Sequence, residues 1–199
     1  MINENFVIIG VIIQFIGGLS YLIDTVKGKI QPNKVSWLLW SIAPLIAFIA
    51  EIKQGIGILS LTTFIVGFVP LLIFISSFVN KKAEWKLNAF DLTYGLLSII
   101  GLILWYITKV GNVAIFFSIL ADGLASIPTI VKSYKEPETE NHLPFTLGIP
   151  NSVIAILTIR NWNFQSYGFP AYLLFVNSII AVLVRYKIGK KIQGIISNF

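Results

Sequence analysis

Residues 42–50 read Ile42-Ala-Pro-Leu-Ile-Ala-Phe-Ile-Ala50, and residues 97–105 read Leu97-Ser-Ile-Ile-Gly-Leu-Ile-Leu-Trp105. The strands of a membrane barrel alternate polar and apolar residues over about ten positions, and neither stretch alternates. The whole chain has a mean hydropathy of +0.82, with 56% hydrophobic and 12% charged residues. A soluble domain needs more polar surface than this composition supplies. The sequence therefore predicts an all-α membrane protein that uses the bilayer as its solvent.

Similar apolar tracts recur along the chain, and each approaches or exceeds the length of about 20 residues that a helix needs to cross a bilayer. The tracts are Phe6–Val26, Val35–Ala50, Ile56–Val79, Phe90–Ile107, Val113–Val131, Leu143–Ile159 and Tyr167–Val184. Seven tracts are an odd number, so the two termini are expected on opposite faces of the membrane. Aromatic residues at tract ends, such as Trp37 and Trp162, are interpreted as an interfacial belt.

The basic residues separate strongly between the two faces that these tracts define. One face receives Lys27, Lys29, Lys34, Lys81, Lys82, Lys86, Lys132, Lys135, Arg185, Lys187, Lys190 and Lys191, and the other receives Lys53, Lys109 and Arg160. Cytoplasmic loops are enriched in Lys and Arg, which predicts a cytoplasmic C-terminus and an outer N-terminus. The basic residues occur singly or in pairs, a pattern that disfavours nucleic acid as a partner. The short connections favour a prokaryotic plasma membrane, which is an inner membrane.

The chain also resembles itself at a spacing of 105 positions. The matched segments are Gly18–Ser20 with Gly123–Ala125, Thr25–Lys27 with Ile130–Lys132, Gln31-Pro32 with Glu136-Pro137, and, after one inserted residue, Pro44 with Pro150. This predicts a three-helix repeat in residues 1–79, a linker helix in 80–109 and a second three-helix repeat in 110–199. An odd linker gives both repeats the same orientation, so the repeats are parallel. Chance similarity between apolar helices is the alternative explanation.

The segment Gln31-Pro-Asn-Lys-Val-Ser-Trp-Leu-Leu-Trp40 resembles the motif of the PQ-loop superfamily, which includes the SWEET sugar transporters, lysosomal amino-acid exporters and KDEL receptors. The second half departs from that motif, with Glu136-Pro137 and Leu143-Pro144-Phe145 in its place. The resemblance implies seven helices arranged as two parallel bundles around a linker helix (3+1+3). It implies transport of a small solute by alternating access, or the receptor role that some members have.

Several prolines fall inside the predicted helices, where each removes a backbone hydrogen bond and creates a point of bending. Pro44, Pro128 and Pro150 are the candidate hinges, and the resemblance adds Gln31 and Pro32 as candidate gate residues. The transporters that the chain resembles use prolines in the first two helices of each half. The alternative is that prolines are simply common in membrane helices.

Asp122 is the acidic residue nearest the middle of a predicted helix, where insertion scales assign an ionised Asp a cost of about 2.5–3.5 kcal/mol. It belongs to a small and polar stripe that should face the bundle interior, made of Ser118, Asp122, Ala125, Ser126 and Thr129. A matching stripe on the first helix contains Gln14, Gly18, Tyr21 and Thr25. Asp122 is predicted to bind a substrate hydroxyl or amine, or to take up a proton. A packing role is the alternative.

Amides complete the predicted substrate site. Asn151 follows Pro150, and Asn177 lies in the middle of the last tract. An amide offers donors and an acceptor without a charge, which suits neutral hydroxylated or amide-bearing molecules. Trp40 is a candidate stacking surface for a ring, with an interface anchor as the alternative.

The leading functional prediction is a facilitative or proton-coupled carrier for a small polar, sugar-like or other neutral metabolite. Its site would contain Gln14, Trp40, Ser118, Asp122, Asn151 and Asn177. A receptor or assembly protein of the same fold is the alternative. An enzyme is disfavoured because the sequence shows no nucleophile grouped with a base. No metal or cofactor is expected from a chain with no cysteine and one histidine, His142. The expected partners are a small-molecule substrate and the lipid bilayer, with a homo-oligomer left open.

Overall fold

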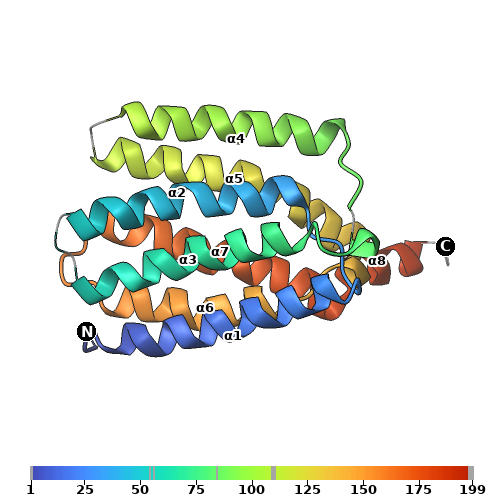
Figure 1. Ribbon diagram of the computed structural model, residues 1–199, viewed down its shortest axis with the longest axis horizontal. Helices are drawn as coiled ribbons and strands as arrows, with labels where there is room; N and C mark the ends of the chain where they lie inside the picture. Colours follow the sequence, from blue (N-terminus) through green and yellow to red (C-terminus); the bar gives the residue numbers. More distant parts are fainter. Residues whose placement is uncertain (1, 54, 56, 84, 109–110, 197–199) are drawn as a thin grey trace.

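The structure is a computed structural model that describes residues 2–53, 55, 57–83, 85–108 and 111–196, and every regular element in these ranges is helical. The long helices run side by side along one common direction (Figure 1). In chain order the elements are α1 (Phe6–Val26), α2 (Lys34–Lys53), η1 (Gly57–Leu59), α3 (Ser60–Ser76), η2 (Lys81–Ala83), α4 (Ala89–Ile107), α5 (Gly111–Lys135), η3 (Pro137–Thr139), α6 (Leu143–Leu157), α7 (Phe164–Tyr186) and α8 (Ile188–Ile196). The predicted all-α class is confirmed.

Among the described residues, six helices are long and apolar enough to cross a bilayer, namely α1, α2, α3 with η1, α4, α5 and α7. The chain is therefore an integral membrane protein. The helix α6 is also apolar but has 15 residues, fewer than the usual span. The predicted tract Phe6–Val26 coincides with α1, whereas the amphipathic helix α8 was not predicted.

Each helix packs against neighbours from distant parts of the sequence. In the bundle, α1 contacts α3 and α6, α2 contacts α3 and α5, and α7 contacts α5 and α6. The helix α4 lies at one edge beside α5 and also touches α2, whereas α1 and α6 form the opposite edge (Figure 1).

Small residues allow the helices to approach closely, as is common in membrane proteins. A Cβ at Gly17 of α1 would lie 3.0 Å from backbone atoms at the start of α6. Hydroxyl groups join other pairs of helices: the Ser36 hydroxyl donates to the Ala125 carbonyl at 2.7 Å, and the Ser98 hydroxyl donates to the Ala121 carbonyl at 2.7 Å. These contacts hold α5 against both α2 and α4.

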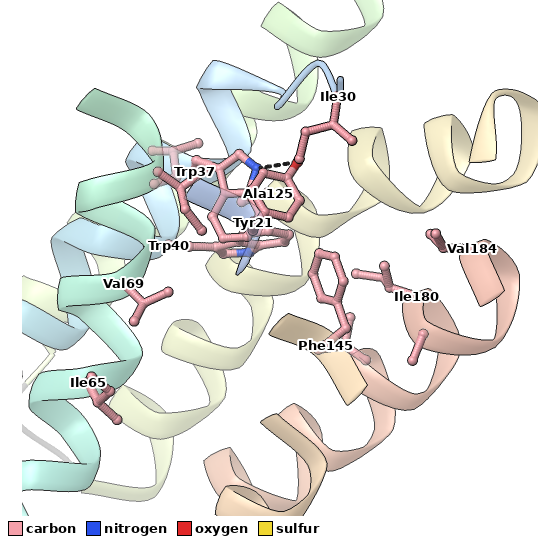
Figure 2. Packing of buried hydrophobic residues seen from close by; sticks show 14 residues of the cluster. Tyr21, Ile30, Trp37, Trp40, Ile65, Val69, Ala125, Phe145, Ile180 and Val184 are labelled. Carbon is pink, nitrogen blue, oxygen red and sulfur yellow. Dashed lines mark hydrogen bonds between the residues drawn. The ribbon is translucent and has the colours of Figure 1, made fainter. Parts of the chain in front are cut away.

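An aromatic cluster fills the centre of the bundle at one level (Figure 2). The Trp37 ring centroid lies 4.7 Å from that of Tyr21, 5.1 Å from that of Trp40 and 5.9 Å from that of Phe145. Trp37 is only 2% exposed, so its predicted place in an interfacial belt is wrong. Burial against α1 and α6 explains this, because the first turn of α2 starts inside the bundle. Trp162, in contrast, is 62% exposed at a helix end.

The start of α4 is fixed by a buried carboxylate. Asp91 and Asn88 form a capping box, in which each side chain accepts from the backbone N–H of the other at 3.1 Å. The Asp91 carboxylate also accepts from the Asn33 amide at 2.9 Å and from the Trp85 indole at 3.1 Å. Asp91 therefore ties α4 to the connection that precedes α2.

The short helix α8 follows Lys187, which has a left-handed backbone with φ 51°. Lys190 and Lys187 reach back to the carboxylate of Glu138 in η3, at 2.8 Å and 3.3 Å. The hydrogen bond from Lys190 is the main reason that the pKa of Glu138 falls to about 2. These contacts hold α8 beside the ends of α5 and α7.

Candidate functional site

The polar stripe of α5 faces the interior, as its spacing predicted. Ala125, Ser126 and Thr129 are buried, and Ser118 is almost so. Residues three or four apart lie on one face of a helix, which places Asp122 on the same side. The matching stripe of α1 also points inward, with Gly18, Tyr21 and Thr25 buried.

Asp122 is held in place by α7 and α2. One carboxylate oxygen of Asp122, Oδ2, accepts a hydrogen bond from the Tyr172 hydroxyl at 2.7 Å. The Trp40 indole donates to the backbone carbonyl of Asp122 at 3.4 Å. Within the described part of the chain the other carboxylate oxygen, Oδ1, has no hydrogen-bond partner. Asp122 thus offers a fixed acceptor in the middle of the bundle.

A cavity of about 60 Å³ adjoins this carboxylate. Its wall consists of polar, aromatic and aliphatic residues, and the aliphatic residues are Val66, Val69, Pro70, Pro144, Leu173, Val176 and Ile180. The polar residues are Gln14, Asp122, Ser152 and Asn177, and the aromatic residues are Trp37, Trp40 and Phe145. Carboxylate, amides and rings therefore converge on one small space, which is the usual composition of a small-molecule site.

A larger cleft of about 630 Å³ continues from the cavity toward one end of the bundle. Val66, Ser152 and Leu173 line both spaces, so the two adjoin. The far part of the cleft is lined by Glu51 near the end of α2 and by Arg160 in the connection between α6 and α7. The cleft therefore opens at the end of the bundle where these two residues lie.

Asn151 joins α6 to α1 on the wall of this cleft. Its amide nitrogen donates to the Gln14 side-chain oxygen, and Asn151 itself is buried. The Asn151 carbonyl oxygen Oδ1 is buried without a partner among the described residues. Asn151 is therefore linked to Gln14, whereas Asn177 lines the cavity separately.

At the opposite end, the bundle is closed by a buried ion pair. The Lys132 ammonium lies 2.8 Å from the Glu140 carboxylate, and the two side chains are 1% and 0% exposed. The Tyr21 hydroxyl donates to the other Glu140 oxygen at 2.7 Å and accepts from the Trp37 indole at 3.3 Å. Figure 2 shows the Tyr21–Trp37 hydrogen bond as a dashed line.

The same ion pair binds the connection that precedes α2. Lys132 donates to the backbone carbonyls of Gln31 and Thr139, the latter at 3.2 Å. The backbone N–H of Gln31 donates to the Thr139 carbonyl at 2.9 Å. The predicted tract Val113–Val131 placed Lys132 in the connection after the helix, and this is wrong because α5 continues to Lys135. We call Tyr21, Gln31, Lys132 and Glu140 the latch.

The structure brings together most, but not all, of the predicted site residues. Gln14, Trp40, Asp122 and Asn177 line the cavity, while Pro44, Ser118 and Asn151 line the cleft. Gln31 and Pro32 lie apart at the latch, and Pro128 and Pro150 lie within α5 and α6. Tyr172, Lys132 and Glu140 were missed. The pairing of Lys132 with Glu140 had one sequence signal, since two residues of opposite charge lie in the same predicted connection, between Val131 and Leu143.

Comparisons with protein-family models, curated proteins and solved structures found no match to this chain. The fold and the site define an α-helical integral membrane protein with a cavity between its helices that is lined by apolar residues and a few polar ones.

Proposed function

We propose that the protein is a membrane carrier for a small polar metabolite that works by alternating access, facilitative or proton-coupled. One observation carries the proposal: a cleft that is open at one end of the bundle leads to Asp122, and the latch closes the other end. A carrier must expose one site to each side in turn, so it needs one open and one closed end at any moment.

The helix pairings support a 3+1+3 arrangement in which α6 is a seventh span. Within the first half α3 contacts α1 and α2, and within the second half α7 contacts α5 and α6. Between the halves, α1 contacts α6 and α2 contacts α5. Exchanging α1 with α5, α2 with α6 and α3 with α7 converts each of these pairings into another of them. The helix α4 is left as the linker, and two such halves can rock about the site between them.

The basic residues support an orientation with the latch toward the cytoplasm. The connections and helix ends near the latch carry twelve of the 15 basic residues of the chain. Since cytoplasmic loops are enriched in Lys and Arg, the open cleft then faces away from the cytoplasm. We place the protein in a plasma membrane of the prokaryotic inner-membrane type.

The prolines support bending close to the site. Pro44 lines the cleft, and Pro150 precedes the cleft residue Asn151 in α6. Pro128 lies in α5 between Asp122 and the latch residue Lys132. A helix bends most easily where proline has removed a hydrogen bond, so these positions suit a movement that opens the latch.

The alternative is a receptor or assembly protein of the same fold, in which the cleft binds a ligand and the latch stays closed. A receptor for an anionic ligand needs a free basic group in its cavity. Lys132 is a buried basic residue of the described chain, but its ammonium group is already paired with Glu140. The carrier is therefore the better explanation of the site.

Access to Ser152 tests the proposal without knowledge of the substrate. Ser152 is buried and lines both the cavity and the cleft, and the natural chain contains no cysteine. Ser152→Cys is therefore a single, nearly isosteric thiol. It should react with a membrane-impermeant thiosulfonate added to either side of sealed vesicles. The exposed residues Lys81 and Asn161, each changed to Cys, report which face is which.

In a carrier, Ser152→Cys is labelled from both sides of the vesicle membrane. Holding the latch closed slows labelling from the cytoplasmic side alone. Labelling only from the side of the cleft, in vesicles whose Lys81→Cys control labels from the other side, would reject alternating access. That result would favour the receptor.

A further inference from the structure

The charges around the candidate site are unbalanced. Among the described lining residues, two carboxylates, Asp122 and Glu51, face the cavity and the cleft, and Arg160 is the basic residue on the same walls. Arg160 is 73% exposed at the mouth and already pairs with Glu4. A carboxylate inside a membrane protein needs a compensating group, because its charge is costly in a poorly polar surrounding.

Neither carboxylate has hydrogen-bond donors for both of its oxygens among the described residues. Tyr172 occupies one oxygen of Asp122, and the Thr63 hydroxyl donates to one oxygen of Glu51 at 3.0 Å. The second Glu51 oxygen is buried without a hydrogen-bond partner among the described residues. Each carboxylate thus keeps one oxygen for a donor that the described residues do not supply.

Aromatic rings surround the same small cavity. Trp40 meets Trp37 edge-on with centroids 5.1 Å apart, and its centroid lies 6.3 Å from that of Phe145. All three rings line the cavity together with Asp122. The face of an aromatic ring attracts a cation, with an energy of about 2 kcal/mol or more where water is excluded. Rings beside a carboxylate therefore favour a positive group over a neutral one.

The size of the cavity restricts which part of a ligand it can hold. An apolar cavity of about 150 Å³ accommodates benzene, whereas this cavity measures about 60 Å³. A sugar ring is too large for it, but a primary ammonium group is not. The adjoining cleft of about 630 Å³ has room for the rest of such a molecule.

We infer that the site recognises a primary amine that is protonated at neutral pH, with the ammonium group in the cavity between Asp122 and the rings and the polar tail in the cleft. This inference rests on the proposed function and narrows its substrate class from a neutral metabolite to an organic cation. Asp122 forms the ion pair with the ammonium group, Trp37, Trp40 and Phe145 supply their ring faces, and Glu51 attracts the cation into the cleft.

A set of probes with the same chain length tests the charge requirement directly. The probes are 4-amino-1-butanol, 1,4-butanediol and 4-hydroxybutyrate, which are cationic, neutral and anionic, with glucose as a hydroxylated ring. Each is titrated into the purified full-length protein in detergent by calorimetry and by thermal unfolding. A ligand that binds the folded state raises the unfolding temperature. We expect 4-amino-1-butanol alone to bind and stabilise.

The variants separate a charge contact from a folding defect. Asp122→Asn should weaken binding of 4-amino-1-butanol by about thirty-fold or more, as expected when one partner of a buried charge pair is removed. Asp122→Glu keeps the charge and should restore part of the affinity. Glu51→Gln should cause a smaller loss, because Glu51 is half-buried. Asp24→Asn removes a carboxylate outside the cavity and the cleft and should bind like the parent.

Equal or tighter binding of the diol, the anion or glucose would overturn the amine assignment, and so would a failure of all four probes to bind. Equal affinity of the parent and a folded Asp122→Asn variant would overturn it as well. In each case the labelling of Ser152→Cys from both sides decides independently whether the protein is a carrier. The substrate class and the transport function can therefore fail separately.

Discussion

Neutralising one half of the latch should destabilise the protein far more than a surface substitution. In Glu140→Gln the side chain keeps its shape and can still accept from Tyr21, but the Lys132 ammonium loses its counter-charge. Both side chains are almost completely inaccessible, so solvent cannot replace the lost partner. Removing one partner of such a buried pair costs about 3–5 kcal/mol. For a chain of this size that loss lowers the unfolding temperature by about 6–20 °C.

The double variant Lys132→Met, Glu140→Gln provides the decisive comparison. It leaves no unpaired charge, and apolar replacements of buried ion pairs are often well tolerated. The double variant should therefore unfold at a higher temperature than Glu140→Gln alone, as measured by intrinsic fluorescence during heating in detergent. Lys29, which pairs with Asp24 at 3.6 Å on the surface, is the matched control, and Lys29→Met should change little.

Two outcomes would refute this reasoning. A shift below about 2 °C for Glu140→Gln would mean that the pair is solvated or absent. A double variant less stable than the single variant would mean that Lys132 stabilises the fold through its backbone contacts and not through Glu140.

Three further predictions follow from individual contacts. Asp91→Ala should lower the free energy of unfolding, measured by thermal denaturation, by about 1–3 kcal/mol. The substitution removes a capping box and leaves the buried Asn33 amide nitrogen without its partner. Stability equal to that of the parent would contradict this. Ser36→Ala should cost about 1 kcal/mol for its bond to Ala125, and an unchanged unfolding temperature would show that the bond contributes nothing. The pKa of Glu138 in the folded protein is about 2, below the ordinary value of 4.5. The contacts of Glu138 with α8 should therefore weaken only as the pH falls from about 4.5 to about 2. Loss of hydrogen-exchange protection in α8 near about pH 6 would contradict this.

The sequence was sufficient to locate the apolar helices, six of which are long enough to cross a bilayer among the described residues. Apolar tracts bounded by charges and turn residues mark where the chain enters and leaves the bilayer, and Phe6–Val26 matches α1 at both ends. The inward faces of α1 and α5 were also predictable, because small and polar residues recur every three or four positions. These features depend on local pattern alone.

The contacts of the site were not predictable in the same way, because they join residues far apart in the chain. Asp122 and Tyr172 are 50 positions apart, and Tyr21 and Glu140 are 119 apart. Many tyrosines and carboxylates could satisfy such pairings on an apolar background, and a single sequence does not choose among them. Asp122 was identified by its cost in the membrane, whereas its partner Tyr172 has no such signal.

Lys132 and Trp37 were misplaced for a related reason. A lysine or tryptophan at the end of an apolar tract usually marks the membrane interface. Here Lys132 donates to the connections between α1 and α2 and between α5 and α6, and Trp37 packs against Tyr21 of α1 and Phe145 of α6, so that both side chains are buried. Burial of the Lys132 charge is compensated by the carboxylate of Glu140, eight positions further along the chain.

We propose that the cleft closes when the latch opens and that the latch closes when the cleft opens. Pulsed electron–electron double resonance can measure the distances between spin labels that follow these movements in lipid vesicles. One label pair is placed at Lys27 and Lys135 near the latch, and another at Lys53 and Asn161 near the cleft. Alternating access predicts two distances for each pair, with the wide state of one pair accompanying the narrow state of the other, and Glu140→Gln should favour opening at the latch. A single distance for each pair, unchanged in Glu140→Gln, would contradict the account.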